Sequence, residues 1–159
     1  MSAELKFIVD HNAGKLVKLL RLMGYDTTFF NGESDSAMVT MAIAEDRIIV
    51  TRDTHILQRR AVTRGRLKVI LVQSDNPEEQ IRELAASLKL DCRSRTFSLC
   101  LECNRPLVNV SKEQVKALVP PFVFKTQDEY RQCPACRRIY WKGTHWEDMV
   151  RKLEKIEKG

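Results

Sequence analysis

Three aspartates stand at or just past the ends of apolar, strand-like runs. The aspartates are Asp10, Asp53 and Asp75, and the runs that precede them are 7–9, 48–50 and 69–72. Apolar and β-branched runs of this kind are typical of strands that are covered on both faces. In an open α/β sheet, ligands bind outside the carboxyl ends of the parallel strands, so these side chains are expected to converge. Because unpaired carboxylates repel one another, the pattern favours a shared divalent cation.

Four cysteines in the last third of the chain form two Cys-x-x-Cys pairs. They are Cys100, Cys103, Cys133 and Cys136. Two such pairs can surround one zinc ion with sulfurs at about 2.3 Å and leave no open position, so the predicted site is structural. Disulfides are the alternative, which a reducing compartment disfavours. The remaining cysteine, Cys92, is predicted to be a small buried apolar residue.

Basic residues follow Asp10 closely in the sequence. Lys15, Lys18 and Arg21 occupy one part of a predicted helix that ends at Gly24, and they can contact phosphates beside the strand end. A solvated basic face explains them equally well. No glycine-rich phosphate-binding motif follows any predicted strand, which argues against dinucleotide or nucleoside triphosphate chemistry.

Composition limits the classes of protein without choosing a function. The 159 residues are 43% hydrophobic, with a formal net charge of +6 that favours a polyanionic partner. Four zinc-bound thiolates would offset part of that charge, so it is weak support for nucleic acid. We expect a soluble, cytoplasmic protein with no membrane partner, since no apolar run reaches about 18 residues and the first residues do not resemble a signal peptide.

Strand and helix patterns alternate before residue 91. Helices are predicted over 15–23, 35–44 and 56–64 and from Pro77 onwards, and strands over 7–9, 25–30, 47–51 and 68–72. This order predicts an α/β fold with a mostly parallel sheet flanked by helices. Asp35 is read as a helix cap or first-turn acid, or else as a fourth carboxylate of the site. Helix capping alone can also explain Asp75.

A polar stretch at 91–96 is predicted to be a hinge between domains at 1–91 and 97–159. The second domain is predicted to be a zinc ribbon with a C-terminal helix that packs on the ribbon or on the first domain. Ser111 and Gln114 fit a capping box for a short helix that ends at Pro120-Pro121. Tyr140 and Trp141 can stack bases, although packing inside a small zinc domain explains them as well.

Taken together, these segments resemble the Mut-seven-C family, which has a PIN-like ribonuclease domain followed by a zinc ribbon. The likeness extends from about Phe7 to Met149. It rests on Asp10, Gly14-Lys15-Leu16, Gly24-Tyr25-Asp26, Asp35, Thr51-Arg52-Asp53, Ser74–Glu79, the four ribbon cysteines and Tyr140–Trp146.

The resemblance implies a catalytic site in which Asp10, Asp35, Asp53 and Asp75 hold Mg²⁺ or Mn²⁺. The first functional hypothesis is therefore a metal-dependent ribonuclease whose partner is single-stranded or structured RNA. Lys15, Lys18, Arg21 and Arg52 are the candidate RNA contacts. The second hypothesis is a non-catalytic module that binds RNA, with a ribosome or tRNA as candidate partner. A toxin role ranks third, because an attached ribbon is not the usual toxin layout.

Overall fold

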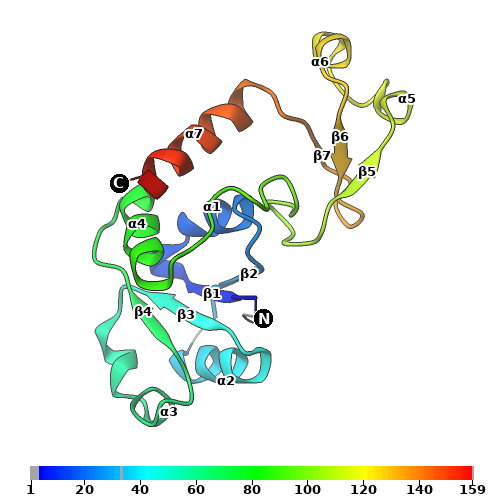
Figure 1. Cartoon of the computed structure of the whole chain (residues 1–159). Coiled ribbons are helices and arrows are strands. Elements are labelled where there is room, and N and C mark those ends of the chain that lie inside the picture. The colour runs from blue at the N-terminus through cyan, green and yellow to red at the C-terminus, as the bar shows by residue number, and fades with distance from the viewer. Residues whose placement is uncertain (1–3, 33, 159) are drawn as a thin grey trace.

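The computed structural model describes residues 4–32 and 34–158 (Figure 1), so the predicted domain limits at residues 1 and 159 lie outside it. The first part of the chain contains β1 (Phe7–Asp10), α1 (Leu16–Leu22), β2 (Thr27–Phe30), α2 (Asp35–Glu45), β3 (Ile48–Thr51), α3 (Arg60–Thr63), β4 (Val69–Leu71) and α4 (Pro77–Leu88), with 3-10 helices η1 (His11–Ala13) and η2 (Thr54–Gln58). The second part contains β5 (Val108–Val110), α5 (Lys112–Val115), α6 (Pro121–Thr126), β6 (Tyr130–Gln132), β7 (Ile139–Tyr140) and α7 (Thr144–Lys158).

The first four strands form one parallel sheet in the order β2-β1-β3-β4. Every residue of β1 and β3, the two central strands, is buried. This agrees with their continuous apolar sequences, because helices cover both faces of the sheet. The predicted α/β fold with a parallel sheet is therefore confirmed, and the carboxyl ends of all four strands lie at one edge.

Two apolar layers hold the sheet between helices. One face packs against α1 and α4, and the other packs against α2 and the 56–67 segment. The last helix, α7, returns to α4 and buries Leu153 completely in the first of these layers. In Figure 1, α7 lies beside α4, far from the tip that carries α5 and α6. Both places predicted for this helix are occupied: its later turns pack on the first domain, and Trp146 near its start packs edge-on against Phe97 of the ribbon domain.

The 91–96 segment, predicted to be a hinge, packs against the first part of the chain. Cys92 is fully buried in the core, as predicted, and burial raises the pKa of its thiol to about 11. The Asp91 backbone N–H donates to the Tyr25 hydroxyl at 2.8 Å. The polar residues of the segment predicted a hinge, but the one cysteine among them anchors the segment to the core.

The ribbon is a three-stranded antiparallel sheet with a small core of Val115, Val119 and Tyr130. The predicted capping box of Ser111 and Gln114 is present. Helix α6 was not predicted, because it begins at Pro121, where the residue pattern indicated only a helix end. Proline suits the first turn of a helix as well as the position after a helix end, so the same dipeptide separates α5 from α6.

The segment predicted as one helix over 56–64 consists of two short helices. Arg59 has an extended backbone (φ −65°, ψ 140°) between η2 and α3. Each short helix still turns apolar residues toward the sheet, because Ile56 is 1% exposed and Ala61 and Val62 pack on the same core, whereas Leu57 is exposed. Among the described residues, no helix combines the length and apolarity that crossing a membrane requires.

Candidate functional site

One threonine hydroxyl links the two aspartates at the ends of the central strands. Asp10 is the last residue of β1, and only 7% of its side chain is exposed. Thr51, at the end of β3, donates from Oγ1 to Asp10 Oδ2 at 2.9 Å and accepts from the Asp53 backbone N–H at 3.1 Å. The ends of the neighbouring strands β1 and β3 thus place the Asp10 carboxylate and the Asp53 backbone on either side of one hydroxyl group.

Asn12 completes this connection from the other side. Its Nδ2 donates to Asp10 Oδ2 at 3.3 Å, and its Oδ1 accepts from the Arg52 backbone N–H at 3.1 Å. The other Asp10 oxygen, Oδ1, accepts from the His11 backbone N–H at 2.8 Å. Among the described residues, the only ion-pair partner of Asp10 is the exposed His11. A buried carboxylate surrounded mainly by neutral donors retains much of its negative potential for a cationic ligand.

Asp53 is held as a carboxylate by His55. Its Oδ1 accepts from the His55 backbone N–H and lies 2.9 Å from His55 Nδ1. The backbone hydrogen bond, followed by that of the imidazole, lowers the pKa of Asp53 below its usual value. Asp53 therefore has two roles. Its side chain caps η2, and its backbone N–H donates to the Thr51 hydroxyl that contacts Asp10.

Asp75 lies on a cavity of about 330 Å³ at the same edge of the sheet. The cavity is also lined by His11, Asn12, Lys15, Arg52 and Gln80. Asn76, rather than Asp75, caps α4, since its side chain accepts from the backbone N–H groups of Glu78 and Glu79. Capping is therefore not the explanation for Asp75.

Gln80 is a site residue that the sequence analysis did not single out. It is 2% exposed, and its Nε2 donates to the Ser74 carbonyl at 2.7 Å. Its Oε1 is buried and has no hydrogen-bond partner among the described residues. A buried acceptor of this kind is costly unless a ligand or water supplies a donor. The helical pattern of α4 gave no signal for this role, because Gln80 stands next to the apolar Ile81 on an otherwise ordinary amphipathic helix.

Asp35 is the first residue of α2, where Ser34 supplies the cap through a hydrogen bond to the Ala37 backbone N–H. It is thus a first-turn acid, which the helix dipole favours. Within 4–32 and 34–158, the only group of three or more His, Cys, Asp or Glu side chains whose ligand atoms lie within 4.8 Å of one another is the cysteine cluster. The Thr51 hydroxyl therefore connects the Asp10 carboxylate to the Asp53 backbone, but the described residues do not gather three or more of the predicted aspartates within that distance.

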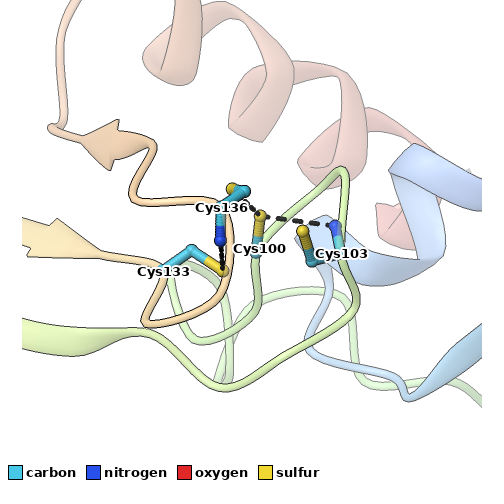
Figure 2. Close-up of side chains that lie close together, drawn as sticks. All are labelled: Cys100, Cys103, Cys133 and Cys136. Carbon is cyan, nitrogen blue, oxygen red and sulfur yellow. Dashed lines mark hydrogen bonds between the residues drawn. The ribbon is translucent and has the colours of Figure 1, made fainter.

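Four cysteine sulfurs converge from two turns of the chain (Figure 2): Cys100 and Cys103 precede β5, and Cys133 and Cys136 lie between β6 and β7. A tetrahedral zinc site with bonds of about 2.3 Å has sulfur–sulfur edges of about 3.8 Å. The Sγ atoms of Cys100 and Cys136, one from each pair, lie 3.7 Å apart. The cluster can therefore hold zinc without rearrangement of these two ligands.

The two cysteine turns have the same backbone geometry. In each, the first cysteine accepts at its carbonyl from the residue four positions later, Asn104 or Arg137, at 2.9 Å. Both of these residues have a left-handed backbone, with φ of 61° and 65°. The backbone N–H of the second cysteine points to the sulfur of the first in both turns. This repetition aims both pairs at one ion.

The cysteine sulfurs are too close for all of them to ionise without a cation. Hydrogen bonding with Cys136 raises the pKa of Cys103 to about 12. Zinc relieves this conflict because it stabilises the thiolate form of every ligand. The donor set and its closed geometry fit the predicted structural zinc site.

A family model described as "Mut7-C RNAse domain" matches residues 5–153 of the sequence. The chain belongs to the Mut7-C family. Neither the curated proteins nor the solved structures contained a match to it. The resemblance stated from the residue pattern is thereby confirmed over nearly the whole chain, and family membership supports a ribonuclease-type function.

Three of the four predicted RNA contacts of this Mut7-C chain are exposed, and the fourth is not. Lys15 and Arg52 line the cavity beside Asp75. Lys18 pairs with Glu102 of the first cysteine turn at 2.9 Å while 64% of its side chain stays exposed. Arg21, in contrast, is 9% exposed.

Arg21 instead fastens the ribbon to the parallel sheet. Its Nε donates to the Thr27 carbonyl at 3.0 Å, and its Nη1 donates to the carbonyls of Leu101 and Glu102 at 2.8 and 3.2 Å. Burial lowers the pKa of Arg21, but a guanidinium stays charged at neutral pH. Because Arg21 is buried and these carbonyls occupy its Nε and Nη1 donors, we do not retain it among the residues proposed to contact RNA.

Replacing Arg21 with Leu is expected to destabilise this Mut7-C chain by about 3 kcal/mol, because buried carbonyls lose charged donors. The free energy of unfolding from urea titration checks this. Lys18→Leu removes a neighbouring exposed cation that forms only a surface ion pair, and it is expected to cost about 1 kcal/mol or less. Equal effects of the two substitutions would contradict the assigned role of Arg21.

Proposed function

We propose that this Mut7-C chain is a metal-dependent ribonuclease that hydrolyses RNA phosphodiester bonds. The observation that carries the proposal is the buried Asp10 carboxylate, joined through Thr51 to Asp53 at the carboxyl edge of the sheet. Membership of a family described as an RNase domain supports the same reaction class.

The residues at this edge fit Mg²⁺ or Mn²⁺, because both ions prefer carboxylate and other oxygen ligands. Asp10 and Asp53 would hold the ion directly. Asp35 and Asp75 would act through ordered water, since Mg²⁺ keeps several waters and so tolerates more distant carboxylates. When bound, the ion would activate a water and neutralise charge on the scissile phosphate.

Residues around the cavity would hold and orient the RNA. The Lys15 and Arg52 side chains line the space beside Asp75, where they would bind phosphate oxygens. Lys18 would leave its ion pair with Glu102 and bind a phosphate of the RNA strand where that strand leaves the cavity. The unpartnered Oε1 of Gln80 would accept a hydrogen bond from a ribose hydroxyl or a water bound with the RNA.

A second function is a non-catalytic module that binds RNA, with a ribosome or tRNA as partner, in the cytoplasm. One observation favours it: among the described residues, the four aspartates do not form a cluster with oxygens within 4.8 Å of one another. In this alternative the acidic edge serves the fold, and the ribbon and basic residues supply the affinity.

The test is cleavage of 5′-labelled single-stranded and hairpin RNA in Mg²⁺ or Mn²⁺, comparing wild type with Asp53→Asn. Asp46→Asn is the matched control, because Asp46 is an exposed residue with a left-handed backbone (φ 55°) that asparagine tolerates. Cleavage that requires the metal, survives in Asp46→Asn and is lost in Asp53→Asn supports the enzyme. RNA binding without cleavage in all three proteins supports the binding module.

A further inference from the structure

The longest stretch of uncompensated positive charge lies just after Asp53. Between residues 54 and 74 there are five lysines and arginines and no acidic residue, and the five are Arg59, Arg60, Arg64, Arg66 and Lys68. The whole chain has a net charge of +6, so this stretch supplies most of that charge. With zinc on four thiolates, the rest of the molecule is close to neutral. We call residues 59–68 the basic segment.

The fold turns the charges of the basic segment outward. Its apolar residues, Ala61, Val62 and Leu67, pack on the core behind the sheet. The five basic residues are all exposed. Anchoring one side of a short segment by apolar contacts fixes the positions of the charges on the other side, which lowers the entropy lost when a ligand binds them.

Acidic side chains do not neutralise these charges. Elsewhere basic residues pair with acids, as Arg47 does with Asp26 and Arg93 with Glu157. Within residues 4–32 and 34–158, none of the ion pairs involves a residue of the basic segment. A surface that concentrates unpaired charge of one sign attracts a polyanion over distances of about a Debye length, about 8 Å at physiological salt.

The basic segment starts at the candidate catalytic edge. It follows Asp53 through η2, and Arg59 donates from Nη1 to Ser36 Oγ at 2.9 Å, beside Asp35. It ends where β4 begins, at the amino edge of the sheet. In Figure 1, α3 lies at the end of the molecule opposite the ribbon tip. An RNA strand bound to the basic segment would lead away from the aspartates, on the side of the molecule opposite the ribbon.

We propose that the basic segment binds the phosphate backbone of single-stranded RNA as it extends from the catalytic edge. The inference rests on the proposed function for the identity of the polyanion. It predicts contacts without base specificity, because arginine and lysine at these positions meet phosphates and no aromatic residue lies between 59 and 68 for stacking. The recognised unit is the repeating phosphodiester rather than a single nucleotide.

The test is RNA affinity as a function of salt for the combined variant Arg60→Gln, Arg64→Gln and Arg66→Gln. A fluorescent single-stranded RNA is titrated in an Asp53→Asn background, so that cleavage does not consume the probe. Loss of three phosphate contacts is expected to lower the slope of log affinity against log salt by about 2. The affinity near 0.1 M salt should fall at least about tenfold.

The matched control removes the same charge from other exposed positions, with Arg82→Gln, Lys125→Gln and Lys155→Gln. The control should keep the wild-type slope. Equal losses in both triple variants would overturn the proposal in favour of a general net-charge effect, and no loss in either would overturn it as well. A loss of binding to phosphatidylserine vesicles without a loss of RNA binding would identify a membrane surface instead and would also overturn it.

Cleavage separates this inference from the proposed function. If the wild type cuts no RNA but the arginine triple variant still loses affinity and slope, the nuclease proposal fails and the basic segment remains an RNA-binding surface. If the wild type cuts RNA and the triple variant binds and cuts it equally well, only the basic segment proposal fails.

Discussion

Asp10→Asn is expected to reduce RNA cleavage at least about 100-fold while changing the free energy of unfolding by about 1 kcal/mol or less. The rate falls because the amide removes the negative charge that would hold the cation. Stability changes little because asparagine keeps the size of Asp10 and its amide oxygen still accepts from the Thr51 hydroxyl and from Asn12 Nδ2, so only the hydrogen bond from the His11 backbone N–H is lost. Steady-state cleavage and urea unfolding of the same preparation measure the two effects.

Comparison with Thr51→Val separates the effect of the negative charge on Asp10 from the effect of the hydrogen bonds that Thr51 makes to Asp10 and to Asp53. Valine keeps the shape of Thr51 but removes the link between Asp10 and Asp53, so we expect a smaller rate loss than in Asp10→Asn and a larger loss of stability. If Asp10→Asn retains full activity, Asp10 is not a metal ligand. If it instead unfolds the protein, its buried charge serves the fold, and the non-catalytic alternative gains support.

Cys133→Ser is expected to release zinc and unfold the ribbon. Structural zinc sites contribute about 10–16 kcal/mol of apparent binding free energy at neutral pH, far more than the small core of Val115, Val119 and Tyr130 can replace. Bound zinc per chain should fall from one towards zero. Proteolysis should then cut between residues 104 and 132. The helices that flank the parallel sheet should keep their circular dichroism signal.

Cys92→Ser is the matched control for zinc, because it changes a cysteine that is buried away from the cluster. It should lower stability through a polar atom in the core and leave the zinc content unchanged. Zinc retained at one equivalent in Cys133→Ser would contradict a four-sulfur site. Zinc lost in Cys92→Ser would contradict the assignment of that residue to the core.

Local patterns predicted the elements of this fold well. The β-branched run of Ile48–Thr51 gave a central strand, and Gly24 marked the end of α1 with a positive φ of 91°. The cysteine spacing identified the cluster that can hold a metal, because each turn is built from adjacent residues. In each of these cases the residues that determine the local structure lie within a few positions of one another in the sequence.

Contacts between distant positions were the part that could not be predicted. Arg21 looks like an exposed basic residue of α1, and its burial is explained only by contacts with distant residues, such as its hydrogen bond to the Leu101 carbonyl, 80 positions away. Thr51 and Gln80 have ordinary places in a strand and a helix, and their roles depend on Asp10 and on the cavity. Asp35 and Asp75 show the same limit, since capping patterns and ligand patterns share the same residue types.

The return of α7 to α4 makes the ribbon an insertion within the sheet domain, with both of its ends fastened to the same body. A folded ribbon holds residues 97 and 143 at a fixed distance from each other. An unfolded ribbon is a long flexible loop, whose ends must be brought together when α7 docks on α4. Closing a loop costs more entropy as the loop lengthens. Metal supply would therefore tune the docking of the last helix, so that zinc limitation loosens a surface that contains none of the zinc ligands.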